Sequence, residues 1–312
     1  MTLGLRVLVT GGAGFIGRWV TKRLLRHHEV IALDNLSNGS EENIKEFRGK
    51  PSFRFMRADI LGFSSVNDVF REIDICVHLA AQVSVQESLD HPERAFKNNV
   101  VGTYNVLEAC RKNDVKIVLV GTCLIYDQAS DKPMSEGHPV KPASPYAASK
   151  LAAEELAISY HHGYGLPVVI TRPFNTYGPY QKSNTEGGVV SIFIKKYLEG
   201  GDILVYGDGE QTRDLLYVED CSDFIVKAAF SESAVGEVIN AGTGREVSIK
   251  DLALMICKDK ARIKHVPHPH PQSEVRRLVC DYSKVKKMLG WKPETSLEDG
   301  IMKTIDWMKH SR

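Results

Sequence analysis

The sequence predicts an α/β protein built on a doubly wound parallel sheet, together with a smaller and discontinuous second lobe. In the first half of the chain, short apolar runs rich in β-branched residues alternate with longer helical patterns. A glycine-rich turn follows the first of these runs, and the alternation stops after Pro173. Apolar strands separated by helices form parallel sheets that are covered on both faces, which is the doubly wound class.

The individual elements of this sheet follow from the apolar runs and the helical patterns between them. The predicted strands are Arg6–Thr10, Val30–Asp34, Phe53–Arg57, Ile73–Leu79, Lys116–Gly121 and Val168–Arg172. The predicted helices are Phe15–His27, Ser64–Arg71, Pro92–Lys112 and Tyr146–His162. The order strand, helix, strand predicts βαβ units throughout this part of the chain.

The second lobe is predicted from two segments of different composition. Residues 176–214 are rich in Gly, Tyr and Gln and contain one helical pattern, Val189–Leu198, whereas residues 215–240 return to an α/β pattern. The tail, residues 247–312, carries two more helical patterns. We therefore expect residues 1–175 and 215–246 to form the doubly wound domain, and residues 176–214 and 247–312 to form the smaller α/β lobe.

The composition excludes several classes of partner. Lys and Arg total 40 against 39 for Asp and Glu, so bulk charge does not favour binding to nucleic acid or to an anionic membrane. No apolar run approaches the length of a membrane span, and the N-terminus is typical of a first strand rather than a signal peptide. The six cysteines form no CxxC pair, which favours a reducing cytoplasm over a disulfide framework.

One stretch of the chain is rich in histidine, a residue type that can bind metal ions. His and Pro alternate over His265–Pro271. Proline at this spacing prevents the turn and helix geometries that bring metal ligands together, so an extended loop is predicted and no metal is expected.

The eight residues TGGAGFIG after the first predicted strand are typical of a dinucleotide-binding turn of the Rossmann kind. Gly11 permits the tight turn, Gly14 lets the backbone approach a pyrophosphate, and Gly17 allows the next helix to pack closely. The amides of Phe15 and Ile16 at the start of that helix would then face the phosphates.

An acidic residue completes this motif. Asp34 ends the second predicted strand, 17 residues after Gly17, close to the usual spacing of about 20 for the acid that binds the adenosine ribose. An acid at this position favours NAD over NADP, and the uncharged Asn35 beside it offers no charge to a 2′-phosphate. The predicted cofactor is NAD.

Three residues further along the chain indicate catalysis. Tyr146 and Lys150 lie one helical turn apart, and Thr122 follows the fifth predicted strand. A lysine ammonium beside a phenol favours the phenolate, so Tyr146 is the predicted base, Lys150 its electrostatic partner and Thr122 a hydrogen-bond donor. A Tyr–Lys pair of this spacing also occurs on helix surfaces, but here it follows a complete nucleotide-binding motif.

The order and spacing of further motifs cover almost the whole chain. They are DNLSNG, HLAA, NNVVGT, SPYAASK, RPFNTYGP, YGDGEQTRDLLYVED and LGWKP. With TGGAGFIG, they resemble the extended short-chain dehydrogenase/reductase family, in its branch of nucleotide-sugar epimerases and dehydratases.

This resemblance implies roles for residues that match the family's motifs. The cofactor would also contact Asn38, Gly39, Asp59, Ile60, Leu79, Ala80, Ala81, Asn99, Tyr146, Lys150 and Pro173. The nucleotide-sugar substrate would contact Thr122, Tyr146, Asn175, Val189, Val190, Tyr206, Arg213 and Arg276. Forked arginine donors match the oxygens of a diphosphate, which suits the two arginines to that role. The resemblance also implies a homodimer, in which the helices Pro92–Lys112 and Tyr146–His162 pair with their symmetry mates.

One departure from the family pattern bears on the reaction. Dehydratases of this branch usually carry an Asp–Glu pair directly after the Thr, but Cys123 and Leu124 stand there in this chain. The leading hypothesis is therefore a 4-epimerase acting on a nucleotide sugar, such as UDP-glucose, UDP-galactose or their N-acetyl forms. One alternative is a dehydratase or 5-epimerase that uses Cys123 as acid or base, and another is a non-catalytic NAD-binding scaffold. The intact Thr122, Tyr146 and Lys150 disfavour the scaffold.

Overall fold

The chain forms two compact units, each assembled from separate segments. The computed structural model describes residues 4–129, 131–184, 188–268 and 270–311. The first unit comprises Met1–Thr122, Ser144–Arg172 and Ser222–Ile239. The second unit comprises Cys123–Ala143, Pro173–Cys221 and Asn240–Arg312.

The boundaries of these units differ from the predicted division mainly at residues 123–143. This segment belongs to the second unit because its polar and backbone groups bond there. Met134 forms a β-bridge with Cys280, and the Tyr126 hydroxyl donates to Asn240 Oδ1 over 2.8 Å. These contacts join residues that are far apart in the sequence. Composition does not reveal them, so the prediction assigned residues 123–143 to the same domain as the residues on either side.

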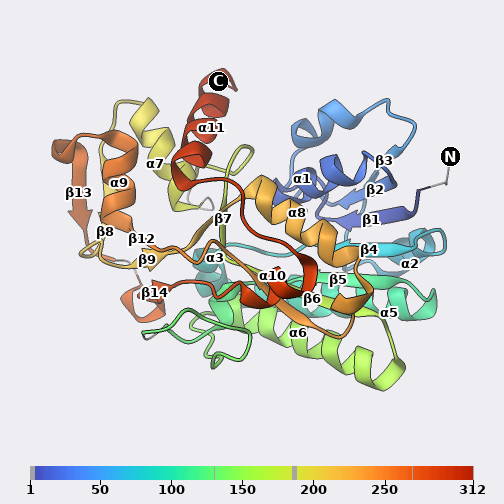
Figure 1. The fold of residues 1–312 in the computed structure, drawn as a ribbon. Helices are drawn as coiled ribbons and strands as arrows, with labels where there is room; N and C mark the ends of the chain where they lie inside the picture. The colour runs from blue at the N-terminus through green and yellow to red at the C-terminus, as the bar shows by residue number, and fades with distance from the viewer. Residues whose placement is uncertain (1–3, 130, 185–187, 269, 312) are drawn as a thin grey trace. The chain divides into compact units, whose positions relative to one another are not determined.

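A seven-stranded sheet forms the framework of the first unit (Figure 1). Its strands are β1 (Arg6–Thr10), β2 (Glu29–Asp34), β3 (Phe53–Arg57), β4 (Ile75–His78), β5 (Lys116–Val120), β6 (Val168–Pro173) and β11 (Val238–Ala241). The order is β11-β6-β5-β4-β1-β2-β3, and the pairs from β6 to β3 are parallel. The strand order reverses between β1 and β4, where doubly wound sheets bind their ligands. The predicted fold class is confirmed, as are the six predicted strands to within about two residues at their ends.

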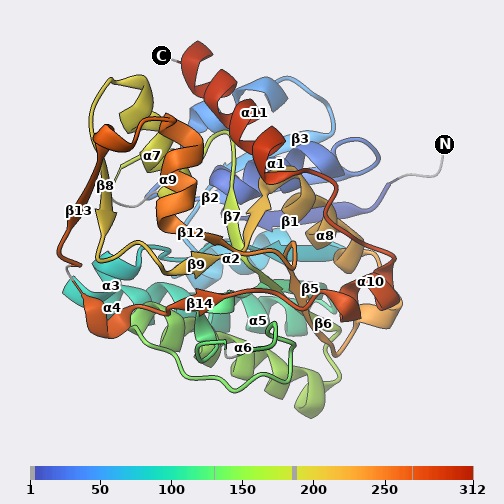
Figure 2. The same ribbon diagram turned by 60° about the vertical axis from the view of Figure 1, so that its left-hand side comes forward.

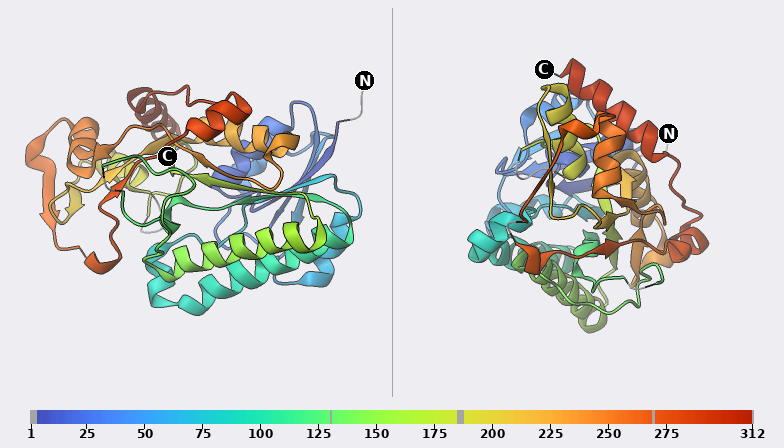
Figure 3. Two further views of the ribbon diagram at one scale, coloured as in Figure 1. Left: turned by 60° about the horizontal axis from the view of Figure 1, so that its bottom comes forward. Right: turned by 90° about the vertical axis from the view of Figure 1, so that its left-hand side faces the viewer.

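Helices cover this sheet on both faces. They are α1 (Phe15–Leu24), α2 (Phe63–Phe70), α3 (Val85–Asp90), α4 (Pro92–Ala95), α5 (Gly102–Lys112), α6 (Pro145–Tyr164) and α8 (Val218–Ala229). Figure 3 shows α5 and α6 running along one face, and Figure 1 shows α1 and α8 on the other, where Arg23 of α1 pairs with Asp223 of α8 over 2.8 Å.

One prediction about these helices is wrong, and one helix was not predicted. The predicted helix Pro92–Lys112 is interrupted, because residues Phe96–Val101 form a π-helical segment between α4 and α5. Helix α3 was not predicted, since it is short and polar and begins with the Ser84 cap rather than with an apolar stripe. Both α3 and the π-helical segment lie beside the carboxyl end of β4. Their polar side chains form hydrogen bonds with neighbouring segments there, as Asn99 does with Gln82 and Ser88 with Tyr146.

The second unit contains short strands and four further helices among its described residues (Figure 2). The strands are β7 (Asn175–Tyr177), β8 (Ile203–Tyr206), β9 (Thr212–Arg213), β10 (Leu215–Tyr217), β12 (Val247–Ser248), β13 (Ile263–Val266) and β14 (Arg277–Leu278). The helices are α7 (Val189–Leu198), α9 (Ile249–Cys257), α10 (Ser283–Leu289) and α11 (Leu297–His310). The tail thus carries three helices where two were predicted. The His265–Pro271 stretch is not wholly a loop, because its first two residues belong to β13; its Pro269 lies outside the described residues.

Each unit has its own apolar core. In the first unit, apolar side chains from the central strands pack against α5 and α6, with Leu8, Ile117, Leu107 and Ala157 fully buried. In the second unit, side chains from α7, β8, α9 and α11 pack together. No described helix has both the length and the apolar content needed to cross a bilayer. All six cysteines are buried and free.

Candidate active site

The glycine-rich turn after β1 has the geometry predicted from its sequence. Gly11 has a φ of +69°, a left-handed conformation that favours glycine. A Cβ on Gly17 would lie 2.1 Å from the carbonyl oxygen of Gly11, so only glycine lets α1 begin this close to the turn. The turn is fixed to the sheet by the Gly11 amide, which donates to the Leu33 carbonyl over 2.8 Å.

The first amides of α1 are available for an anion. Its N-cap is Gly14, which provides no side-chain cap, and the amides of Phe15 and Ile16 have no acceptor within the part of the chain that the structure describes. A helix begins with unpaired N–H groups and a partial positive charge, and both favour a phosphate. These residues therefore fit the pyrophosphate of a dinucleotide.

Polar groups cluster at the end of β2. Asp34 is 6% exposed and accepts from the Ala13 amide over 3.0 Å and from the Leu36 amide over 2.8 Å. Burial raises the pKa of Asp34, while these two backbone bonds act to lower it. The buried Asn38 Oδ1 has no hydrogen-bond partner among the described residues. The Asp34 carboxylate and an unpaired buried acceptor four residues further along the chain suit the hydroxyls of a ribose.

Other residues that are predicted to bind the cofactor lie around the end of β2. Asn35 donates from Nδ2 to Asp59 Oδ2 over 2.9 Å, which links β2 to the loop after β3. A Cβ on Gly39 would lie 2.9 Å from Asp34 Oδ2, so the chain passes directly over that carboxylate. Ile60 is buried, and its carbonyl accepts from Asn105 of α5 over 2.9 Å.

A buried histidine fixes the turn that follows β4. The Thr10 hydroxyl accepts from the amides of Leu79 (3.2 Å) and Ala80 (3.3 Å), so its own hydrogen points to His78 Nδ1 at 2.6 Å. The other ring nitrogen, Nε2, then donates to Thr103 over 3.0 Å. Burial, together with the nearby Lys150, lowers the pKa of His78 to about 3. His78 is therefore a neutral positioning group that orients the Thr10 hydroxyl, which holds the predicted cofactor residues Leu79 and Ala80.

The π-helical segment places Asn99 in a second clamp on this turn. Asn99 Oδ1 accepts from the Gln82 amide over 2.8 Å, and Nδ2 donates to the Gln82 carbonyl over 3.1 Å and to Ser149 Oγ over 2.9 Å. Ser149 lies on α6 next to Lys150. Asn99 thus ties the turn after β4 to the helix that carries the predicted base.

Helix α6 presents Tyr146 and Lys150 from one face. Its N-terminus is set by Pro145, by the Ser144 hydroxyl, which accepts from the Ala147 amide, and by Ser88 of α3, which accepts from the Tyr146 amide over 3.1 Å. Tyr146 is 8% exposed and Lys150 6% exposed. Ser88 was not predicted, because no motif marks it and α3 itself was missed.

Lys150 is anchored at the end of the strand that leads to Thr122. Its Nζ donates to the Val120 carbonyl over 2.6 Å. Burial lowers the pKa of Lys150 to about 8, and the charge of Glu154 opposes this shift. Thr122 is 8% exposed and lies two residues beyond that carbonyl. The three predicted catalytic side chains thus lie on two elements, α6 and the end of β5, that this hydrogen bond joins.

Cys123 belongs to the second unit and is nearly inaccessible. Its Sγ lies 3.9 Å from Asn175 Oδ1, and the residue is 2% exposed. Burial raises the pKa of Cys123 to about 12, against a smaller lowering effect of Arg213. The thiol is therefore protonated at neutral pH and cannot act there as a resident base.

Of the two predicted diphosphate-binding arginines in the second unit, Arg213 lies on β9 and Arg276 directly precedes the adjacent strand β14. The Thr212 amide donates to the Arg276 carbonyl over 2.8 Å, and β14 continues alongside β9. Arg276 is exposed and pairs with Asp208 over 2.9 Å. Arg213 is more buried and pairs with Glu274, whose other oxygen lies 2.7 Å from His268 Nε2.

The other predicted substrate residues differ in accessibility. Val190 is 1% exposed and belongs to the core of the second unit, whereas Val189 is only partly buried, so Val189 is the more accessible of the pair. Tyr206 is 48% exposed and its ring lies 5.6 Å from that of His268. Pro173 is buried at the end of β6.

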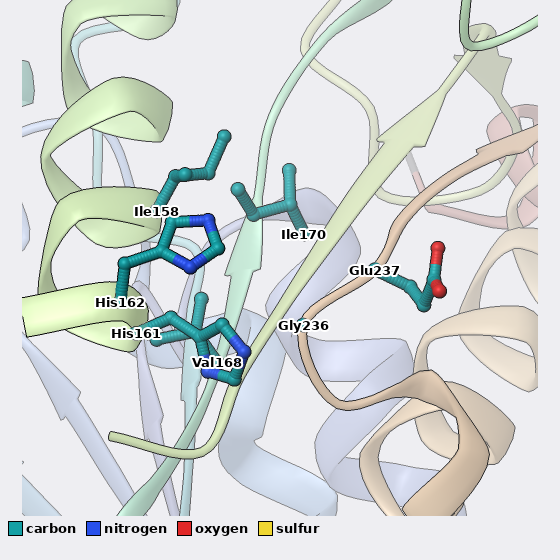
Figure 4. A pocket seen from close by; sticks show the side chains of 7 residues that line it. All are labelled: Ile158, His161, His162, Val168, Ile170, Gly236 and Glu237. Atoms are coloured by element: carbon teal, nitrogen blue, oxygen red, sulfur yellow. The ribbon is translucent and has the colours of Figure 1, made fainter. Parts of the chain in front are cut away.

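A small hollow lies at the other end of the sheet. It is lined by Ile158, His161, His162, Val168, Ile170, Gly236 and Glu237. Figure 4 shows the two histidine rings near Val168, with the Glu237 carboxylate turned away from them. Val168 begins β6, so the hollow lies at the amino ends of the strands, opposite to the ligand-binding edge. Within the described ranges, no cluster of three His, Cys, Asp or Glu side chains could hold a metal ion.

Comparisons with known proteins agree with this geometry. Residues 8–304 match the family described as GDP-mannose 4,6 dehydratase. The chain is 37% identical over 313 residues to the UDP-glucose 4-epimerase of Mycolicibacterium smegmatis, covering 98% of this chain and 99% of the relative.

Two solved structures extend the comparison. The X-ray structure of Pal from Bacillus thuringiensis is 51% identical, with a TM-score of 0.97 over 99% of this chain and 100% of the other. DesIV, a dTDP-glucose 4,6-dehydratase of Streptomyces venezuelae solved with NAD and TYD bound, is 31% identical with a TM-score of 0.94, covering 99% of this chain and 98% of the other. The relatives therefore include both epimerases and dehydratases.

Proposed function

Because the chain belongs to the GDP-mannose 4,6-dehydratase family of NAD-dependent nucleotide-sugar epimerases and dehydratases, we propose that it is a nucleotide-sugar 4-epimerase. The cofactor is NAD, and a UDP-hexose is the proposed substrate. The observation that carries the proposal is the pair Tyr146 and Lys150 on α6, with Lys150 anchored to the strand end that precedes Thr122.

The proposed reaction assigns one task to each catalytic side chain. Tyr146 removes the proton from the 4-hydroxyl of the sugar, and Lys150 stabilises the phenolate form of Tyr146 by its charge. Thr122 donates a hydrogen bond to the reacting oxygen. Bound NAD supplies reversible hydride transfer at carbon four. The turn held by His78 and Asn99, the amides of Phe15 and Ile16, and Asp34 hold the cofactor.

The residues after Thr122 favour epimerisation over dehydration. Leu124 has no ionisable group, and the buried thiol of Cys123 keeps its proton at neutral pH because its pKa is about 12. A base that removes the proton at carbon five is therefore missing from these two positions. Inversion at carbon four requires none.

The same thiol supports one second candidate function. A protonated thiol of high pKa cannot accept a proton at neutral pH, but it can donate one. An enzyme that protonates a sugar carbon or a leaving 6-hydroxyl, such as a dehydratase or 5-epimerase, would use Cys123 as the acid. Its contact with Asn175, a predicted substrate residue, keeps this candidate open.

Product analysis in deuterated water separates the two candidates. The holoenzyme is incubated with UDP-glucose, UDP-galactose and their N-acetyl forms, and the products are identified by NMR. A 4-epimerase gives the C4 epimer with no solvent deuterium in the sugar, and this is the expected result. Deuterium at carbon five or six would refute the epimerase and support the second candidate. No conversion of any nucleotide sugar, with NAD retained, would instead indicate a binding protein.

Replacing Cys123 gives an independent check on the same point. If the enzyme is a simple epimerase, Cys123→Ala and Cys123→Ser both keep most of the turnover, apart from a packing loss. If Cys123 is an acid, Cys123→Ala loses about 10²–10⁴-fold in product release. Turnover of both variants is compared with that of Cys257→Ala, which removes another buried thiol from the same unit.

The diphosphate assignment predicts a binding loss that does not depend on the sugar. Arg213→Ala is expected to weaken UDP binding by about 1.5–3 kcal/mol, because a hydrogen bond to a charged group is lost, and Arg276→Ala is expected to weaken it in the same direction. Titration calorimetry with UDP measures this. Arg277→Ala is the matched control, since Arg277 follows Arg276 but pairs with Glu246 over 2.7 Å. Unchanged UDP affinity in both test variants would show that the diphosphate binds elsewhere.

The proposal also includes a homodimer in a reducing cytoplasm. The segment Pro92–Lys112 exposes three large apolar side chains, Phe96 (57%), Val101 (37%) and Tyr104 (47%), as expected of a helix that packs against a second copy. The six free cysteines support a reducing compartment.

A further inference from the structure

Helix α6 continues the line of catalytic residues with a buried carboxylate that no motif marks. Glu154 lies one turn beyond Lys150, as Lys150 lies one turn beyond Tyr146, so all three share one face of the helix. Glu154 is completely buried. Buried carboxylates are rare unless they are paired, so Glu154 is expected to have a charge partner and a specific role.

The two oxygens of Glu154 have different surroundings. Oε2 accepts from Arg172 of β6 twice, from Nε over 2.9 Å and from Nη2 over 2.7 Å. Oε1 is buried and has no hydrogen-bond partner among the described residues. A Cβ on Gly121 would lie 2.0 Å from Oε1, so the carboxylate presses on the backbone between Val120 and Thr122.

The contact with Gly121 places Glu154 between the residue that accepts from Lys150 and the catalytic Thr122. Lys150 donates to the Val120 carbonyl, Glu154 fills the space beside Gly121, and Thr122 comes next. The Gly121 amide in turn donates to the Thr171 carbonyl over 2.7 Å, next to Arg172. The titratable and charged groups near the Lys150 ammonium are Tyr146 and Glu154 on its own helix, His78 of β4, which is neutral, and Arg172 of β6, which lies beyond Glu154.

We propose that Glu154 is a positioning residue for the proposed reaction: its buried charge, held by Arg172, keeps the Lys150 ammonium protonated and holds the strand end that carries Thr122. The expected effect on turnover rests on the proposed function, whereas the expected effect on the protonation of Lys150 does not. Burial alone favours the neutral amine of Lys150, and a fixed negative charge one turn away opposes that loss. The Lys150 charge that stabilises the Tyr146 phenolate therefore depends on Glu154.

The sign of the expected pH effect follows from this arrangement. Glu154→Gln keeps the shape of the side chain and removes its charge, so the pKa of Lys150 falls further below about 8. Lys150 then loses its proton at lower pH, and the alkaline limb of turnover moves to lower pH by about one unit. Glu154→Asp keeps the charge and should restore titration close to that of the unmodified enzyme.

The test measures Lys150 directly, in the NAD-loaded enzyme. The ¹³Cε resonance of Lys150, assigned by its loss in Lys150→Arg, is followed from neutral to alkaline pH in ¹³C-lysine-labelled protein, and the pH–rate profile is recorded beside it. Glu155→Gln is the matched control, because it removes the same charge from the next, exposed residue. The expected result is a lower titration midpoint in Glu154→Gln alone. A midpoint unchanged in Glu154→Gln, or lowered equally in Glu155→Gln, would overturn the proposal.

A companion variant covers the case in which Glu154→Gln fails to fold. Glu154→Gln combined with Arg172→Gln removes both charges, so no unpaired ion stays buried. Loss of the Glu154 charge lowers the titration midpoint of Lys150, and loss of the Arg172 charge raises it by a smaller amount, because Arg172 is the more distant charge. The midpoint should therefore still fall, but by less than in the single variant. No change in the midpoint would again count against the proposal. The NMR titration needs no substrate. If the enzyme converts no nucleotide sugar, the proposed function is refuted, but the NMR titration still shows whether Glu154 keeps Lys150 protonated.

Discussion

Tyr146→Phe is expected to lower turnover by about 10²–10⁴-fold, the usual loss when a general acid–base group is removed. Lys150→Ala should cost a similar factor, because the phenolate then loses its stabilising charge, and Thr122→Ala somewhat less. The measurement is the steady-state rate with a UDP-hexose, together with the NAD content of each purified variant. Tyr164→Phe is the matched control, since Tyr164 ends the same helix but is 63% exposed.

The outcome separates a catalytic loss from a structural one. Tyr146 lies in the first turn of α6, and its backbone amide, not its hydroxyl, bonds to Ser88. Tyr146→Phe keeps the ring and this amide bond, so the melting temperature and the NAD content of the variant show whether the loss of turnover is accompanied by a structural loss. Near-normal turnover of Tyr146→Phe would end the proposed mechanism.

The largest expected effect on stability comes from the Arg172–Glu154 pair. Arg172→Met leaves the Glu154 carboxylate buried without its charge partner, and breaking a buried pair in this way costs about 3–5 kcal/mol. Urea unfolding monitored by circular dichroism measures the loss. Glu154→Gln with Arg172→Met should recover a large part of it, because no uncompensated charge then stays buried. Equal losses in the single and double variants would show that the pair's charges are unimportant for folding.

The pH dependence of this loss has a defined sign. Burial raises the pKa of Glu154, and Arg172 opposes that effect, so removing Arg172 raises it further. The folded variant then binds a proton that the unfolded chain has released, and its stability falls as the pH rises through this range. The deficit of Arg172→Met should therefore be smaller near pH 5 than near pH 8.

Much of the fold and the cofactor site follows from local sequence. Most of the strands were predictable because buried parallel strands are continuously apolar, and the turn after β1 because its glycines meet steric demands at Gly11 and Gly17 that no other residue satisfies. Asp34 could be located by its spacing from that turn. These signals lie within a few residues, or a fixed number of residues, of one another.

The features that sequence did not predict depend on contacts between distant residues. Residues 123–143 join the second unit through bonds to positions more than 100 residues away, such as Tyr126 to Asn240. Ser88 acts through the backbone amide of Tyr146, and Glu154 acts through its contact with Gly121, the glycine that follows β5. A signal for Glu154 was present in its spacing from Lys150, but only its complete burial separates it from an ordinary surface glutamate on a helix.

The segmented make-up of the two units bears on how the chain acquires its structure. Strand β11 is the last of the main sheet to be made, so during synthesis β6 stays an unpaired edge until about residue 241 has emerged. Open strand edges are templates for wrong pairing, which makes this the interval of greatest aggregation risk. The second unit draws on residues 123–143, 173–221 and 240–312, so its packing is complete only when nearly the whole chain has left the ribosome. Such long sequence separations slow folding, and a chain shortened at its carboxyl end would lose the core of the second unit rather than a peripheral helix.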